Sequence, residues 1–340
     1  MRFSPPFVIT VASAALVVAV NAEAQPPVMK AAVAHEYGGS EMLKYEDAPR
    51  PEPKENEALV RVIASGVNPA DPLLVSGRFA REFGTQLPLI PGYDIAGVVE
   101  KTGAGVTRLK RGDAVYGYPL MGGGWAEFAV VKETEAAPKP PSLSFEEAAA
   151  VPLAALTAWQ ALIDVAELRA GQTVLVHGGS GGVGSFAVQI AKARGARVIA
   201  TASTANQDLL KQLGADVAID YTQQKFEEIA KDVDVVLDPI GRDTLARSYQ
   251  VVKKGGIICT LVARPDPAQL EKFGIRGTGI AVKPDADDLN EITKLIEAKK
   301  LRPLVTQILP LAEAAMACAQ AATKHTRGKM VLKIADAPKS

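Results

Sequence analysis

Residues 174–184 read VLVHGGSGGVG, an apolar strand-like run followed by the pattern G-x-G-x-x-G. Glycine-rich turns are common, but this one follows a strand candidate and opens an amphipathic helix candidate, the context of a dinucleotide-binding turn. Such glycines let the backbone approach a pyrophosphate, while the helix start directs unpaired N–H groups at the phosphates. We therefore expect a dinucleotide to bind at Gly179, Ser180, Gly181, Gly182, Val183 and Gly184.

Strand-like and helix-like segments alternate around this turn, from residue 172 to about residue 299. Strict alternation predicts a parallel sheet with helices on both faces, an α/β fold of the doubly wound Rossmann type. The expected strands are residues 173–176, 197–200, 217–219, 234–237, 257–261 and 279–282, and the expected helices are residues 183–193, 206–213 and 243–252.

The segments outside this region have a different pattern. Residues 29–132 contain short strand-like runs broken by Gly and Pro, which predict a compact barrel or sandwich. Ser144 can cap a helix with acidic residues in its first turn, and a second helix is expected at residues 156–168. Residues 329–333 are expected to form a strand that returns to the first domain.

The end of the second expected strand indicates which dinucleotide binds. An NAD site usually has Asp or Glu about 20 residues after the glycines, bonded to the ribose hydroxyls. Residues 200–204 read ATAST, which offers the hydroxyls of Thr201 and Ser203 to a 2′-phosphate and no carboxylate to repel it. NADP(H) is therefore expected, although the next cationic side chain is Lys211. Tyr221 can flank the adenosine or simply pack on the surface.

Length and composition narrow the remaining possibilities. A chain of 340 residues exceeds what one hydrophobic core usually supports, so two domains are expected. The 38 basic and 38 acidic side chains balance, which argues against a nucleic-acid partner. Cys259 and Cys318 lie in apolar runs, so buried free thiols are expected in preference to a disulfide.

The first 24 residues have the pattern of a secretory signal peptide. Arg2 precedes an apolar stretch of about 14 residues, and Ala22-Glu23-Ala24 forms a cleavage signal. The stretch is shorter than the roughly 20 residues that cross a bilayer, so no membrane span is expected in the mature chain. We expect residues 1–24 to be removed and the protein to be periplasmic or secreted. The alternatives are an uncleaved anchor or a start codon misassigned upstream of Met29, which would make the protein cytoplasmic.

Four segments of the sequence are similar to motifs of a known protein family: residues 64–71 (ASGVNPAD), 91–97 (PGYDIAG), 176–184 (VHGGSGGVG) and 327–329 (RGK). With them the chain resembles the zinc-independent quinone oxidoreductases of the medium-chain dehydrogenase/reductase superfamily, over roughly residues 29–334. The resemblance implies a GroES-like β-barrel catalytic domain (residues 29–150 and 301–335) with a Rossmann NADP-binding domain (residues 151–300) inserted. It places the active site in the cleft between the domains and implies a homodimer.

The resemblance also implies roles for particular side chains. Four match positions near the nicotinamide and substrate: Asn68, Asp71, Tyr93 and Thr157. The alternatives are that Asn68 and Asp71 cap a turn, that Tyr93 lines the pocket, and that Thr157 is an ordinary helix hydroxyl. Val262 and Lys329 are expected to contact the cofactor.

No metal site is expected. Zinc-binding members of the superfamily have a cysteine where Asn68 stands and a histidine where Tyr93 stands. A catalytic zinc needs three protein ligands and an open fourth position, and an amide and a phenol are poor replacements. His35, His177 and His325 are far apart and show no ligand spacing.

The expected activity is transfer of a hydride from NADPH to a quinone or an α,β-unsaturated carbonyl compound. Related enoyl-thioester reductases carry a tyrosine donor where this chain has Phe79, which disfavours that substrate class. A hypothesis of another kind is an exported dinucleotide-binding protein with little turnover that senses redox state or binds a partner. Turnover distinguishes the two, because both predict cofactor binding.

Overall fold

The computed structural model of the chain describes residues 1, 27–79, 84–323 and 326–338. The expected signal peptide, residues 1–24, falls almost wholly outside these ranges, so its removal and the export of the protein stay predictions. Over the described ranges, no helix has both the length and the apolar composition needed to cross a membrane.

One lobe of the molecule is a Rossmann domain. Its strands are β8 (Thr173–Val176), β9 (Arg197–Ala202), β10 (Val217–Asp220), β11 (Val233–Asp238), β12 (Val252–Thr260) and β13 (Arg276–Gly279). They form one sheet in the order β10-β9-β8-β11-β12-β13, with every neighbouring pair parallel, which is the Rossmann strand order. Three successive residues of the central strand, Val174, Leu175 and Val176, are fully buried, so both faces of the sheet are covered. The helices are α5 (Gly182–Ala193), α6 (Gln207–Leu213), α7 (Phe226–Ile229), α8 (Arg242–Ser248) and α9 (Pro267–Phe273).

The other lobe is the GroES-like domain. Its strands are β1 (Val28–Ala34), β2 (Leu43–Pro49), β3 (Glu57–Val67), β4 (Asp94–Thr102), β5 (Ala114–Gly117), β6 (Phe128–Lys132), β7 (Ala136–Pro138), β14 (Val305–Pro310) and β15 (Lys329–Lys333). β1 and β2 form a hairpin, and the others form a sheet in the order β14-β15-β3-β4-β5-β7, with β6 paired to β3. β15 lies antiparallel to β3, with Met330 opposite Val67. The two ends of the chain therefore build one domain, and the Rossmann domain is inserted between them.

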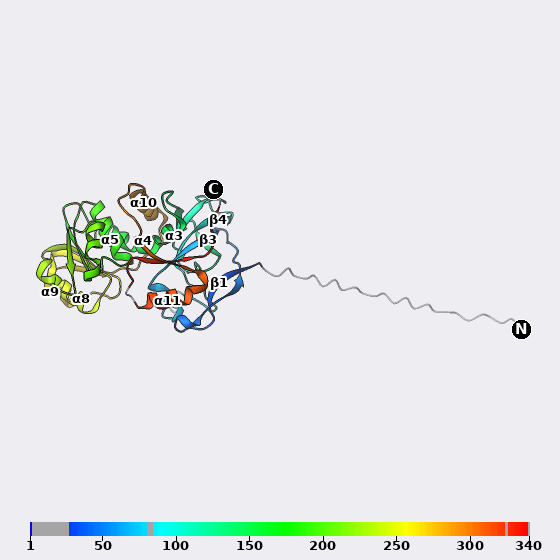
Figure 1. Cartoon of the computed structure of the whole chain (residues 1–340), viewed down its shortest axis with the longest axis horizontal. Helices are drawn as coiled ribbons and strands as arrows, with labels where there is room; N and C mark the ends of the chain where they lie inside the picture. Colours follow the sequence, from blue (N-terminus) through cyan, green and yellow to red (C-terminus); the bar gives the residue numbers. More distant parts are fainter. Residues whose placement is uncertain (2–26, 80–83, 324–325, 339–340) are drawn as a thin grey trace.

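Further helices lie in and beside the GroES-like domain. They are α1 (Ala70–Val75), α3 (Phe145–Ala149), α4 (Pro152–Trp159), α10 (Ala286–Glu297) and α11 (Ala314–Ala322). Among them, α4 contacts both lobes. Figure 1 shows α5, α8 and α9 in one lobe, β1, β3, β4 and α11 in the other, and α4 and α10 between them. The helix expected after Ser144 is α3, and Ser144 and Glu147 bond each other's backbone N–H groups in a capping box.

Several expected elements have different bounds in the structure; β12, for example, begins at Val252 rather than at residue 257. The helix expected at residues 156–168 begins at Pro152, whose missing N–H is harmless in a first turn, and continues as a π-helical turn (Gln160–Val165). The helix expected at residues 243–252 ends at Ser248 and leads through a 3-10 turn into β12. The strand expected at residues 279–282 is wrong: β13 ends at Gly279 because its partner β12 ends opposite it, at Thr260.

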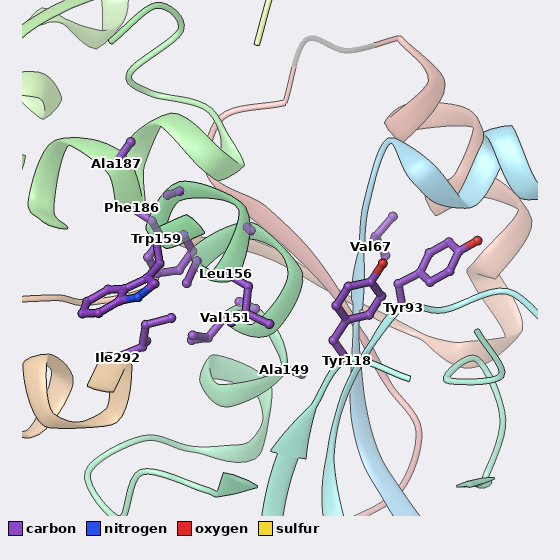
Figure 2. Packing of buried hydrophobic residues seen from close by; sticks show 14 of the residues in the cluster. Val67, Tyr93, Tyr118, Ala149, Val151, Leu156, Trp159, Phe186, Ala187 and Ile292 are labelled. Atoms are coloured by element: carbon purple, nitrogen blue, oxygen red, sulfur yellow. The ribbon is translucent and has the colours of Figure 1, made fainter. Parts of the chain in front are cut away.

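One cluster of buried apolar side chains runs from the Rossmann domain into the GroES-like domain. It includes Phe186 of α5, Leu156 of α4, and Tyr93 and Tyr118, all of which are labelled in Figure 2. The interiors of the two lobes are therefore joined. Both cysteines are buried free thiols, as expected.

Replacing Phe186 with alanine should lower the unfolding midpoint markedly. Phe186 is fully buried, and removing such an aromatic side chain typically costs about 3–5 kcal/mol. Denaturant unfolding followed by circular dichroism measures the effect. The control is Ile308→Ala, because Ile308 is 52% exposed and surface changes stay within about 0.5 kcal/mol. Equal midpoints for the two variants would contradict this packing.

Candidate active site

The phosphate loop (residues 178–184) joins the central strand β8 to helix α5. Gly181 is the N-cap of α5, and among the described residues no side chain caps the first turn. A Cβ atom at Gly184 would lie 2.1 Å from the carbonyl oxygen of Gly178, so only glycine lets the chain pass this close. The loop thus leaves N–H groups and the positive end of the helix dipole for an anion. These residues fit the pyrophosphate of a dinucleotide.

The beginning of β15 lies against the phosphate loop. The backbone N–H of Gly328 donates to the carbonyl oxygen of Ser180 at 2.8 Å, and Gly328 forms a parallel bridge with Gly181. A Cβ atom at Gly182 would lie 3.2 Å from Cδ of Lys329. Lys329 therefore stands beside the expected cofactor site, where the two domains meet.

The ammonium group of Lys329 is bound inside the GroES-like domain. Its Nζ lies 3.0 Å from Oδ2 of Asp94 and also donates to Oδ1 of Asn68. Nδ2 of Asn68 donates to the same Asp94 oxygen at 2.8 Å, and the other oxygen accepts the N–H of Leu153, in the first turn of α4, at 2.6 Å. We call Lys329, Asp94 and Asn68 the lysine network. All three side chains are buried, and a buried ion pair holds only when its polar atoms are satisfied in this way.

Asp94 is a site residue that sequence reasoning missed. It lies within residues 91–97, one of the segments that carry the family resemblance. It is the charged first residue of a strand whose next residues are apolar. A carboxylate in such a strand is almost never fully buried unless it is paired. An aspartate in this position therefore indicates that a buried cation lies beside it, and in the structure this cation is the ammonium group of Lys329.

Asp71 connects two segments of the site. Its Oδ2 accepts the backbone N–H of Asn68 at 2.7 Å, and its Oδ1 accepts that of Gly92 at 2.9 Å. The structure therefore shows Asp71 capping the turn, which is one of the two roles expected for it. Burial raises the pKa of Asp71 to about 7, against the opposing effect of these two hydrogen bonds.

Tyr93 and Tyr118 form an aromatic pair in the GroES-like domain. Their ring centroids are 5.9 Å apart with an interplanar angle of 81°, and Figure 2 shows the Tyr118 hydroxyl beside Val67 and the Tyr93 hydroxyl pointing away from it. Burial raises the pKa of Tyr93 above its ordinary value, so the phenol stays protonated. Its hydroxyl forms no hydrogen bond within the described part of the chain, so it can still donate one. Tyr118 was not predicted, because nothing in the sequence marks its position next to Tyr93.

Thr157 lies in α4, where its Oγ1 donates to the carbonyl oxygen of Leu153 at 2.6 Å. This is the bond that a threonine commonly makes to the preceding helical turn. The hydroxyl hydrogen of Thr157 is therefore bonded within its own helix, and a role at the nicotinamide stays a prediction.

Thr201 supports the phosphate loop from inside the protein. Its Oγ1 accepts the backbone N–H of Gly178 at 3.2 Å and lies 3.3 Å from Nδ1 of His177. Thr201 is 3% exposed, so its hydroxyl does not reach the surface where a 2′-phosphate was expected to meet it. Burial lowers the pKa of His177 to about 3, so the ring is neutral and structural.

Three further expected cofactor contacts lie at the same edge of the Rossmann sheet. Ser203 follows β9, Tyr221 follows β10 and Val262 follows β12 by one residue. Because the strands are parallel, their carboxyl ends share one edge with the phosphate loop. Tyr221 is 58% exposed and Val262 is 51% exposed, so both are open to a ligand.

The residues present do not fit a catalytic zinc ion. Over the described ranges, no three His, Cys, Asp or Glu side chains are grouped so as to hold a metal. His35 bonds Glu46 at the surface, and His325 lies outside the described residues. The amide of Asn68 is bound within the lysine network, where an ammonium group rather than a metal lies among the oxygens.

Comparison with known proteins gives the same assignment for both lobes. The alcohol dehydrogenase GroES-like domain matches residues 54–141, and the zinc-binding dehydrogenase family matches residues 213–332. An NADPH-dependent alkenal/one oxidoreductase from Arabidopsis thaliana is 38% identical, covering 94% of this chain and 83% of the plant protein. A quinone oxidoreductase from Rattus norvegicus is 33% identical, covering 89% of this chain and 96% of the rat protein.

A solved structure agrees with these sequence matches. The quinone oxidoreductase from Coxiella burnetii superposes with a TM-score of 0.83 at 34% identity, covering 90% of this chain and 99% of that chain. The similarity includes the inserted Rossmann domain and the GroES-like domain built from both chain ends. The chain therefore belongs to the medium-chain dehydrogenase/reductase superfamily of oxidoreductases, as a quinone oxidoreductase-like member.

Proposed function

We propose that this oxidoreductase transfers a hydride from NADPH to a quinone or an α,β-unsaturated carbonyl compound, without a catalytic zinc. The observation that carries the proposal is the lysine network beside the phosphate loop. Asn68 stands where zinc-binding members have a ligand, and here its amide is bound to Lys329 and Asp94. The relatives named for alkenal/one and quinone reduction support the substrate class.

The chain's own residues position the reactants. When bound, NADPH supplies the hydride. The N–H groups at the start of α5 bind its pyrophosphate, and the backbone of Gly328, directly before Lys329, holds the chain against that loop. The Tyr93 hydroxyl donates a hydrogen bond to the carbonyl oxygen, on which negative charge develops during hydride addition. Its raised pKa suits hydrogen bonding rather than proton release, so water supplies the proton that completes the reduction.

We also propose that the mature chain is exported and forms a homodimer. The pattern of residues 1–24 supports export. β13 ends the Rossmann sheet, so a second copy can pair with its outer edge. Light scattering of the purified mature chain tests the dimer.

The purified mature chain should oxidise NADPH when a quinone or a short-chain enone is added. The measurement is the loss of the absorbance of the reduced nicotinamide, with elemental analysis of the same sample for zinc. Failure to turn over any acceptor in a broad panel, despite calorimetric binding of NADPH, would contradict the proposal. That result would favour a dinucleotide-binding sensor instead.

Replacing Tyr93 with phenylalanine should lower kcat about tenfold to a hundredfold, because an oxyanion-stabilising donor is removed. NADPH binding should stay unchanged, since Tyr93 lies in the GroES-like domain. The control is Tyr118→Phe, which keeps the aromatic pair and should retain most of the activity. Equal activities for Tyr93→Phe and the unmodified chain would exclude Tyr93 from the reaction.

Replacing Lys329 with methionine should lower both stability and nucleotide affinity. The buried Asp94 carboxylate loses its cation, which typically costs about 3–5 kcal/mol. The dissociation constant for NADPH should rise about tenfold, because the neighbouring phosphate loop loses support. Calorimetry and thermal unfolding give the two readouts. Lys333→Met is the control: it lies on the same strand with a 47% exposed side chain and should change neither value.

A further inference from the structure

The carboxyl ends of β9 and β10 bring together residues that are far apart in the sequence. The two strands are parallel, with Asp220 opposite Ala202. The adenosine ribose of a dinucleotide lies beyond the end of the second Rossmann strand, which is β9 here. Residues 200–204 contain no carboxylate, but Asp220, 9% exposed, ends the neighbouring strand at the same edge of the sheet.

Asp220 binds the hydroxyl groups around it. Oγ1 of Thr204 donates to one carboxylate oxygen at 2.5 Å. Thr222 donates to the other oxygen through its backbone N–H at 3.0 Å and through its Oγ1 at 2.7 Å. The bond from Thr204, followed by those from Thr222, holds the pKa of Asp220 below its ordinary value, so the group is charged at neutral pH. The Oγ1 atoms of Thr204 and Thr222 also lie 3.0 Å apart, so the two hydroxyls and the Asp220 carboxylate form one hydrogen-bonded group.

Few donors remain for a 2′-phosphate. Ser203 Oγ accepts from Nδ2 of Asn206 at 3.1 Å, which leaves its own hydrogen available. Residues 203–228, all of which the structure describes, contain only two cationic side chains. They are Lys211, paired with Asp208, and Lys225, paired with Glu228. The charge balance beyond β9 and β10 is therefore negative.

We propose that Asp220 sets the dinucleotide preference of this chain, weakening the binding of a 2′-phosphate so that NADH is used as well as NADPH. The inference rests on the proposed function and specifies its cofactor. A 2′-phosphate carries up to about two negative charges, which the Asp220 carboxylate repels. A free 2′-hydroxyl can instead donate to that carboxylate, which has acceptor capacity left beyond its present bonds.

Two nucleotides that differ only in the 2′-phosphate test the proposal by calorimetry: adenosine 2′,5′-bisphosphate and adenosine 5′-monophosphate. Their dissociation constants for the unmodified chain should lie within about tenfold of each other. In Asp220→Asn, the bisphosphate should bind about tenfold more tightly and the monophosphate as before or slightly more weakly. A preference of the unmodified chain for the bisphosphate above about a hundredfold, or an equal shift for both nucleotides, would overturn the proposal.

Asp216→Asn is the matched control. Asp216 precedes β10 at the opposite end of the same strand, where it bonds Lys192 and the N–H of Val198. Its replacement removes the same charge and should leave the ratio of the two affinities unchanged. A second variant, Asn206→Lys, keeps the bonds of Asp220 and adds a cation beside Ser203. It should also tighten bisphosphate binding selectively, and a lack of any change would count against the proposal even if Asp220→Asn folds poorly.

Steady-state kinetics separate this inference from the proposed function. If the function is correct, the ratio of kcat/KM for NADPH to that for NADH should rise about tenfold in Asp220→Asn. If no acceptor is reduced while the binding pattern holds, the reductase proposal fails and the role of Asp220 stands. If turnover is found and the ratio does not move, the role of Asp220 fails and the reductase proposal stands.

Discussion

The buried ion pair between Lys329 and Asp94 is the interaction on which the arrangement of the site depends. It joins the first residue of β4 to the first residue of β15. Taking both charges out of water is unfavourable unless other hydrogen bonds support the pair, and Asn68 and the start of α4 supply such bonds. Because Gly328, the residue directly before β15, pairs with the phosphate loop, the same contact places the GroES-like domain beside the cofactor site.

The parallel Rossmann sheet imposes the second constraint. All its strands end at one edge, so loops that are far apart in the sequence meet around the bound dinucleotide. The phosphate loop contributes backbone N–H groups, whereas the ends of β9 and β10 contribute side chains. The first depends on glycines that no other residue can replace, as the contact between Gly184 and Gly178 shows. What the side chains at the ends of β9 and β10 can bind depends on which polar groups there already bond one another. Cofactor preference can therefore change while the fold stays the same.

Sequence reasoning succeeded where the structure depends on near neighbours. The strand–turn–helix at residues 173–193 and the Ser144 cap are set within a few residues, and both were predicted. It failed where a distant partner decides. β13 ends where β12 ends, which no local pattern reveals. Asp94 bonds a lysine 235 positions away, and Asp220 reaches Thr204 only because two strands are parallel.

The place of β15 in its sheet has a consequence for how the polypeptide is made. The Rossmann strands are contiguous in sequence, from Thr173 to Gly279, whereas the GroES-like sheet needs β15 between β14 and β3. Domains fold as units as they leave the ribosome. The inserted domain can therefore fold while the earlier-synthesised one still lacks β15, an internal strand of its sheet. Until the last residues emerge, Asp94 has no counter-ion, so the half of the molecule that is translated first is the last to mature.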